Sequence, residues 1–157
     1  MKPVAGFTLI ELMVTLAVMA VLAAAGTPFA LSWMDSNRQL QARNLMWEGI
    51  SQARAVALRN PGEAVQGSVS AKLQRSGNTL KVVGAGSNVA LWTGELPDGA
   101  TTQLADASGS ASGDLSCVAF DNRGQRVTTG SDCVVAADKT RIAVGFSSQD
   151  VLHVDLL

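Results

Sequence analysis

The sequence is poor in the residues on which most enzymes and nucleic-acid binders depend. Its 157 residues include no tyrosine, one histidine, two cysteines and only 4% aromatic residues. The formal net charge is −1, so no global basic field attracts nucleic acid or anionic lipid. Phosphate-loop, zinc-protease and nucleophile-elbow motifs are also missing. We therefore expect a protein that is not an enzyme, with no catalytic residue, no metal site and no cofactor.

Charge is also missing from the segment between Glu11 and Asp35, where an apolar run extends to Met34. Such a run is long enough to cross a bilayer as a helix, which needs roughly 20 apolar residues. A secretory signal places a short apolar core before its cleavage site. Here a short basic leader, Met1–Gly6, comes first. Cleavage after Gly6 would leave the apolar helix on the mature protein.

The segment Gly6-Phe7-Thr8-Leu9-Ile10-Glu11-Leu12 resembles the processing site of type IV prepilins and of type II secretion pseudopilins. The resemblance implies cleavage by prepilin peptidase between Gly6 and Phe7, followed by N-methylation of Phe7. It also implies that Glu11 neutralises the N-terminal amine of a neighbouring subunit and so sets the register of a filament. The alternative is an ordinary signal anchor that contains a glutamate by chance.

Glu11 is a functional candidate on physical grounds as well. An acidic side chain at the centre of a membrane helix costs roughly 2.5 to 3.5 kcal/mol on insertion scales, so it needs a partner. Glu11 lies close to the start of the mature chain, so its carboxylate can instead reach the headgroups by snorkelling. The two arrangements can follow one another, with snorkelling in the membrane and pairing after assembly.

Two further features divide the N-terminal helix. Pro28 removes one backbone hydrogen bond and predicts a kink or local melting near residues 24–27. From Asp35 onward the pattern becomes amphipathic, and Asn60-Pro61-Gly62 predicts its end. The apolar face of this second part, expected to pack on a sheet, consists of Ala42, Met46, Ile50, Ala53 and Ala57.

Beyond residue 64 the apolar residues follow a period of two, which predicts strands. A Ser/Gly-rich stretch, Ala105–Asp114, is expected to be a mobile surface loop. His153 alternates with the apolar residues of the last strand, so we expect it on the surface. The expected strands are Ser68–Leu73, Thr79–Val83, Val89–Leu96, Ala100–Leu104, Leu115–Phe120, Gln125–Thr128, Arg141–Phe146 and Val151–Leu156.

The two cysteines, Cys117 and Cys133, predict a disulfide. Closing a loop of about 16 residues stabilises a domain by roughly 3 kcal/mol in the chain-entropy model. Export across the inner membrane would place the pair in an oxidising compartment. Two free buried thiols are the alternative. A Ca²⁺ site between Asp121 and Asp132 is conceivable, but solvated turn aspartates are the preferred interpretation.

The strand-rich part resembles the globular domain of the GspH/FimT group of minor pilins and pseudopilins. The motifs that carry this resemblance are the Leu96-Pro97-Asp98-Gly99 turn, the Phe120-Asp121-Asn122-Arg123-Gly124 hairpin and the closing pair of strands. It implies an α+β pilin fold, with a long N-terminal helix packed on an antiparallel β-sheet domain. The expected parts are the leader 1–6, the transmembrane half-helix 7–34, the amphipathic half 35–60 and the β-rich domain 61–157.

The resemblance implies a structural subunit, either a FimT/FimU-like minor pilin that joins or primes a type IV pilus or a GspH-like minor pseudopilin of type II secretion. The implied partners are other major and minor pilins or pseudopilins, prepilin peptidase, an inner-membrane assembly platform and, before assembly, membrane lipid. The chain would sit in the inner membrane with a periplasmic domain, then enter the filament. A third possibility is DNA capture through Arg123, Arg126 and Arg141, although a charged hairpin tip is the preferred interpretation.

Overall fold

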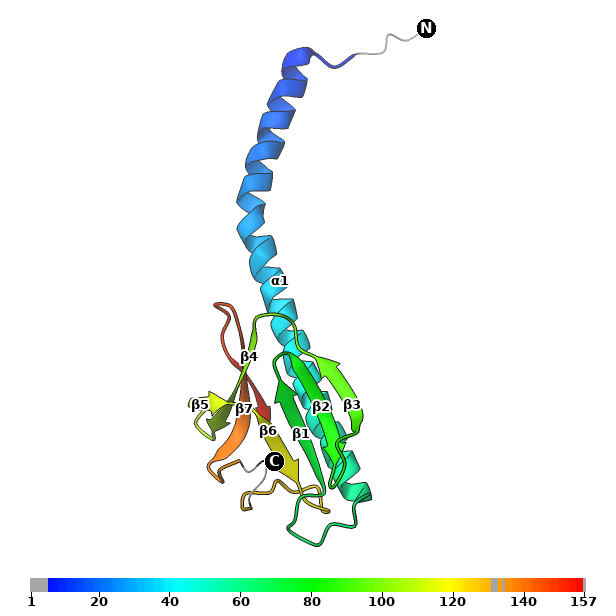
Figure 1. The fold of residues 1–157 in the computed structure, drawn as a ribbon. Coiled ribbons are helices and arrows are strands. Elements are labelled where there is room, and N and C mark those ends of the chain that lie inside the picture. The colour runs from blue at the N-terminus through cyan, green and yellow to red at the C-terminus, as the bar shows by residue number, and fades with distance from the viewer. Residues whose placement is uncertain (1–5, 131–132, 134, 157) are drawn as a thin grey trace. The chain divides into compact units, whose positions relative to one another are not determined.

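The computed structural model describes residues 6–130, 133 and 135–156. These residues form one long helix and eight strands (Figure 1). The helix, α1, spans Leu9–Arg59. The strands are β1 (Ala71–Ser76), β2 (Thr79–Gly84), β3 (Ala90–Glu95), β4 (Ala100–Asp106), β5 (Ala111–Asp114), β6 (Cys117–Phe120), β7 (Lys139–Phe146) and β8 (Leu152–Asp155). The α+β fold class predicted from the sequence is confirmed.

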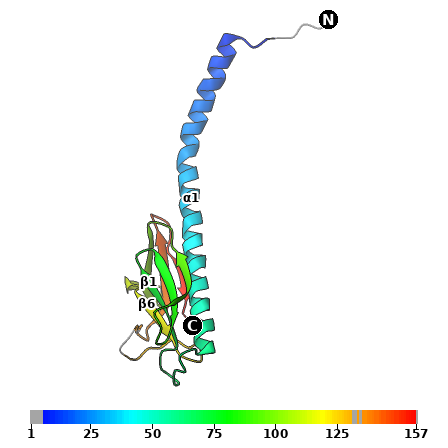
Figure 2. The same cartoon turned by 45° about the vertical axis from the view of Figure 1, so that its right-hand side comes forward.

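The chain divides into two compact units, residues 1–34 and residues 35–157, and α1 contributes to both. In the first unit, the described residues 6–34 are all exposed. The second unit contains the rest of α1 and every strand. Figure 2 shows these strands lying along one side of the C-terminal part of α1.

Within the second unit, α1 buries the apolar face that its sequence predicts. The five predicted residues Ala42, Met46, Ile50, Ala53 and Ala57 are all buried. Gly49 lies on the same face, where an added Cβ would approach Leu73 and Trp92 side-chain atoms to 3.1 Å. The helix and the sheet therefore pack closely at this glycine. α1 ends at Arg59, and Asn60 follows with φ of 46°, as expected at a helix terminus.

The strands form two four-stranded antiparallel sheets. The first has the order β3-β2-β1-β6, and its β1–β2 hairpin turns at Gly77-Asn78, so that β1 extends three residues beyond the expected strand end at Leu73. The second has the order β5-β4-β7-β8 and includes the predicted closing pair, β7 and β8. One apolar core joins α1 to both sheets, with Leu73 and Phe120 from the first and Ile142 and Val144 from the second.

Arg75 links the two sheets. Its Nη1 donates to Thr102 Oγ1 at 2.7 Å, and its Nη2 donates to the Ala100 carbonyl at 3.3 Å. Arg75 belongs to β1, while Ala100 and Thr102 belong to β4. Charge-assisted hydrogen bonds of this kind fix geometry more strongly than neutral ones. The chain thus uses a cation to connect strands of two different sheets, β1 and β4, which share no backbone ladder.

Two strand predictions were wrong. The expected loop Ala105–Asp114 contains the end of β4 and all of β5, which pair with each other. The expected strand Gln125–Thr128 forms only one isolated bridge, between Phe120 and Arg126. Residues Ala111–Asp114 have low β propensity, but pairing with β4 makes them a strand. By contrast, the segment Gln125–Thr128 separates from β6 after a single bridge.

Candidate functional site

The candidate processing site lies at the start of the described chain. Gly6, Phe7 and Thr8 precede the first helical residue, and the Phe7 side chain is 79% exposed. An added Cβ at Gly6 would meet nothing within 4 Å. The peptide bond between Gly6 and Phe7 is therefore open to an enzyme in the isolated chain. The rest of the predicted leader, residues 1–5, lies outside the described residues.

Thr8 and Glu11 form a reciprocal cap on the first turn of α1. The Glu11 amide donates to Thr8 Oγ1 at 3.3 Å, and the Thr8 amide donates to Glu11 Oε2 at 3.5 Å. This is a capping box, in which two N–H groups at a helix start are satisfied by side chains three residues apart. A carboxylate is also favoured at a helix N-terminus by the helix dipole.

The cap places the Glu11 carboxylate beside the backbone one residue after the expected new N-terminus, Phe7. Thr8 is not among the functional residues predicted from the sequence. The spacing Thr-x-x-Glu before an apolar run is a known helix-start signature, so the sequence contained the signal. The arrangement holds an exposed acidic group at the start of the apolar part of α1.

In the first unit, the apolar part of α1 presents a surface that the described residues do not cover. No side chain from residue 6 to residue 34 is buried within the chain. By length and composition α1 is the one described helix that could cross a membrane, and it lies near the N-terminus. Exposing such a large apolar surface to water is unfavourable.

Pro28 lies within this part of α1. The helix continues through it without interruption, so the local melting expected near residues 24–27 is not found. Pro28 cannot donate to the carbonyl of Ala24. One residue earlier, the Thr27 hydroxyl donates to the Ala23 carbonyl at 2.9 Å, a contact that often bends helices. A kink at Pro28 in the assembled state remains a prediction.

Cys117 and Cys133 form a disulfide in the structure, with their Cα atoms 5.4 Å apart. The bond connects β6 to the loop that precedes β7. Between the two cysteines lies the Asp121–Gly124 turn. Asp121 is buried, and its Oδ1 accepts hydrogen bonds from the amides of Arg123 and Gln125, each at 2.9 Å. Asp121 is thus a buried turn cap rather than the solvated aspartate expected, and Asp132 lies outside the described residues.

The three arginines considered for DNA binding have different surroundings. Arg123 is exposed at the Asp121–Gly124 turn. Arg141 forms an ion pair with Asp155 at 2.9 Å and donates to the Ala107 carbonyl. Arg126 donates to the carbonyls of Ala136, Ala137 and Lys139. Two of the three guanidinium groups are therefore occupied by contacts within the chain.

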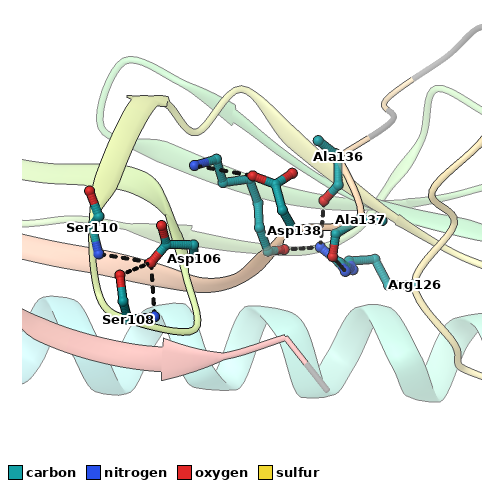
Figure 3. A network of polar contacts seen from close by, with 8 residues as sticks. Asp106, Ser108, Ser110, Arg126, Ala136, Ala137 and Asp138 are labelled. Carbon is teal, nitrogen blue, oxygen red and sulfur yellow. Dashed lines mark hydrogen bonds and ion pairs between the residues drawn. The ribbon is translucent and has the colours of Figure 1, made fainter.

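Figure 3 shows the polar contacts around Arg126 and around the loop after β4. In that loop Asp106 Oδ1 accepts from the Ser108 hydroxyl, the Ser108 amide and the Ser110 amide. The pKa of the Asp106 carboxyl is lowered below its ordinary value, mainly by the hydrogen bond from the Ser108 hydroxyl and next by the hydrogen bond from the Ser110 amide. The carboxylate thus stabilises the turn that leads from β4 to β5.

His153 differs from its expected surface position. It is half-buried, and its Nδ1 is a buried atom without a hydrogen-bond partner among the described residues. Its backbone carbonyl accepts from Arg43 Nε at 3.4 Å. An added Cβ at Gly109 would lie 3.3 Å from His153 Nε2. The ring therefore packs beneath the β4–β5 loop.

Together, the fold and the exposed apolar helix describe an α+β protein with a candidate N-terminal membrane anchor. Residues 1–27 match the family model described as the prokaryotic N-terminal methylation motif. This type IV prepilin-like signal confirms the resemblance predicted from Gly6–Leu12 and supports a type IV pilin-like protein. It implies processing by prepilin peptidase and assembly with other pilins. No curated protein and no solved structure matches the chain.

Proposed function

We propose that this chain is a minor type IV pilin of the FimT/FimU kind, a structural subunit that joins or primes a pilus. The observation that carries the proposal is the methylation motif at residues 1–27, which includes the start of a helix whose side chains are all exposed as far as residue 34. A protein with such a surface needs a non-aqueous partner both before and after assembly.

In this proposal the chain first rests in the inner membrane through the apolar half of α1, with residues 35–157 in the periplasm. Prepilin peptidase cuts between Gly6 and Phe7, and Phe7 is N-methylated. The subunit then leaves the membrane at the assembly platform. Glu11 pairs with the terminal amine of a neighbouring pilin, which compensates for burying a carboxylate among apolar helices.

The decisive experiment is the intact mass of the protein purified from membranes of its own host. We expect a chain that begins at Phe7, carries one additional methyl group and lacks the two hydrogens of the Cys117 and Cys133 thiols. A mass that retains residue 1, or that begins near residue 30, would contradict the proposal. Gly6→Val should block cleavage, whereas Gly26→Val, at an equally open glycine, should leave the mass unchanged apart from the substitution.

Glu11 can be tested separately from its capping role. Glutamine can replace glutamate in a capping box, so Glu11→Gln keeps the cap and removes the charge. We expect Glu11→Gln to be processed normally but to be depleted from sheared fibres. The matched control is Glu63→Gln, an exposed residue just beyond α1. Normal fibre entry of Glu11→Gln would overturn the pairing role while leaving the processing result intact.

A GspH-like minor pseudopilin remains the second candidate, because the same motif and the same exposed helix serve both systems. The two are distinguished by the fibre with which the processed protein copurifies. Recovery with surface pili supports the pilin. Recovery only with the periplasmic secretion pseudopilus, together with loss of protein export in a deletion strain, would replace it with the pseudopilin.

A further inference from the structure

The described part of residues 35–157 contains a hollow of about 340 Å³ that the proposed function does not use. Its lining comes from three separate segments: Arg54 of α1, the residues that follow the Asp121–Gly124 turn, and Leu156 after β8. Arg54 and Arg126 face the hollow together with Gln125 and Thr128. Two arginines, a glutamine and a threonine thus line one small space.

Arg126 is fixed in place without being neutralised. Its three acceptors, on Ala136, Ala137 and Lys139, are uncharged backbone carbonyls (Figure 3). Burial lowers the pKa of the Arg126 guanidinium, and the nearby Asp138 carboxylate opposes this only in part. Asp138 itself pairs with Lys139 at 3.5 Å. The positive charge of Arg126 is therefore held at the wall of the hollow, with its orientation set by the loop before β7.

Arg54 is less well satisfied. Its guanidinium carbon lies 5.4 Å from the centroid of the Phe120 ring, which is fully buried. Its Nε is a buried atom with no hydrogen-bond partner among the described residues. Burial lowers the pKa of the Arg54 guanidinium. A half-buried cation with an unused N–H is costly unless an anion or an acceptor compensates it.

From these contacts we infer that the hollow between Arg54 and Arg126 is a binding site for a compact oxyanion, of the size of inorganic phosphate. Among the described residues no ion pair reaches Arg54 or Arg126, and an oxyanion would supply a negative charge to both guanidiniums. A small rotation of the Arg54 guanidinium would present Nε–H and one Nη–H as a fork, the geometry in which arginine binds carboxylate and phosphate groups. Gln125 and Thr128 offer an amide and a hydroxyl to the remaining oxygens, and Leu156 closes one side.

The first test uses the full chain in zwitterionic detergent micelles, with ¹⁵N-labelled arginine. Inorganic phosphate is titrated against chloride at constant ionic strength, and the Nε–H resonances are followed. We expect saturable shifts at Arg54 and Arg126 and no comparable shift at Arg59, an exposed arginine five residues along the same helix. Shifts that do not saturate, or that appear equally at Arg59, would overturn the proposal.

The second test measures the increase in melting temperature that phosphate causes in each variant, rather than the melting temperature itself. This choice keeps the test valid if a variant is less stable, because only the response to phosphate is compared. We expect the increase to be lost in Arg54→Met, reduced in Arg54→Lys and retained in Arg59→Met. An unchanged increase in Arg54→Met would show that phosphate acts elsewhere and would refute the site.

Discussion

The two parts of α1 belong to one continuous helix but differ in what covers them. Residues 9–34 are uncharged apart from Glu11, and none is buried by the chain itself. From Gln39 onward, one face of the helix is buried against two sheets. The second part therefore has its packing partner within its own sequence, whereas the first part must find a partner outside it. A helix can be regular throughout while only half of it contributes to the stability of the folded domain.

The largest expected effect compares two methionines on α1. Met46 is 0% exposed and Met19 is 66% exposed. Met46→Ala should lower the free energy of unfolding by about 2–5 kcal/mol, because it opens a cavity in the core. Met19→Ala should change it by no more than about 0.5 kcal/mol, as is usual for an exposed site. Urea denaturation in zwitterionic micelles measures both. Equal losses would mean that the first part of α1 also packs on the domain.

An introduced charge should have a large effect in the first part of α1 and little effect in the second part, the reverse of the methionine substitutions. Val21→Arg puts a cation in the middle of the uncharged run and should cost about 2.5–3.5 kcal/mol of membrane insertion. Ser51→Arg, at an exposed position of the second part, should leave insertion unchanged. The fraction of protein that resists alkaline extraction of membranes reports the difference. Equal extraction of the two variants would argue against the apolar part as the anchor.

A smaller effect is expected at the start of α1. Thr8→Ala removes the hydroxyl that caps the Glu11 amide and should destabilise the first turn by about 1 kcal/mol. Faster hydrogen exchange at the amides of the first turn, in the uncleaved chain, would show the loss. Thr15→Ala is the control, because the Thr15 hydroxyl donates to a carbonyl within the helix and caps nothing. Unchanged exchange in Thr8→Ala would mean that the capping box does not form.

The smallest expected effect is a change in the pKa of Asp106, which lies within residues 35–157. Since the Ser108 hydroxyl is the main cause of the lowered pKa of Asp106, Ser108→Ala should raise that pKa toward its ordinary value. A lowered carboxyl pKa stabilises the fold above the unfolded-state pKa, and this contribution is lost as the pH falls through the folded-state pKa. Carboxyl ¹³C titration of the full chain measures the shift. An unchanged pKa in Ser108→Ala would assign the effect to the backbone amides instead.

Much of the fold could be predicted because its signals are local. The uncharged run, the periodic face around Met46 and the helix end at Asn60-Pro61-Gly62 each depend on residues close in sequence. The Ala111–Asp114 strand could not be predicted, since Ala-Ser-Gly-Asp has low β propensity and becomes a strand only by pairing with β4. The arrangement of the two sheets could not be predicted either, since contacts such as that of Arg75 with Thr102 join segments distant in sequence.

The candidate functional residues also divide into those that a local motif predicts and those that only the fold brings together. Gly6, Phe7 and Glu11 form a contiguous motif, so the sequence alone pointed to them. Arg54 and Arg126 are far apart in sequence, and only folding brings them to one hollow. Arg141 was considered for DNA binding, yet the register of β7 and β8 places it opposite Asp155. Pairings of this kind follow from strand register, which one sequence does not specify.

The packing of Trp92 has a consequence for spectroscopy. The chain has three tryptophans, and each occupies a different setting. Trp33 is 70% exposed at the end of the apolar part, Trp47 is 64% exposed on the outer face of the second part, and Trp92 is half-buried with its indole N–H donated to Glu48 at 3.1 Å. Variants that keep one indole at a time would give separate emission signals for the apolar part of α1, for the exposed face of its second part and for the edge strand β3. Assembly could then be followed by wavelength and quenching, without an attached dye.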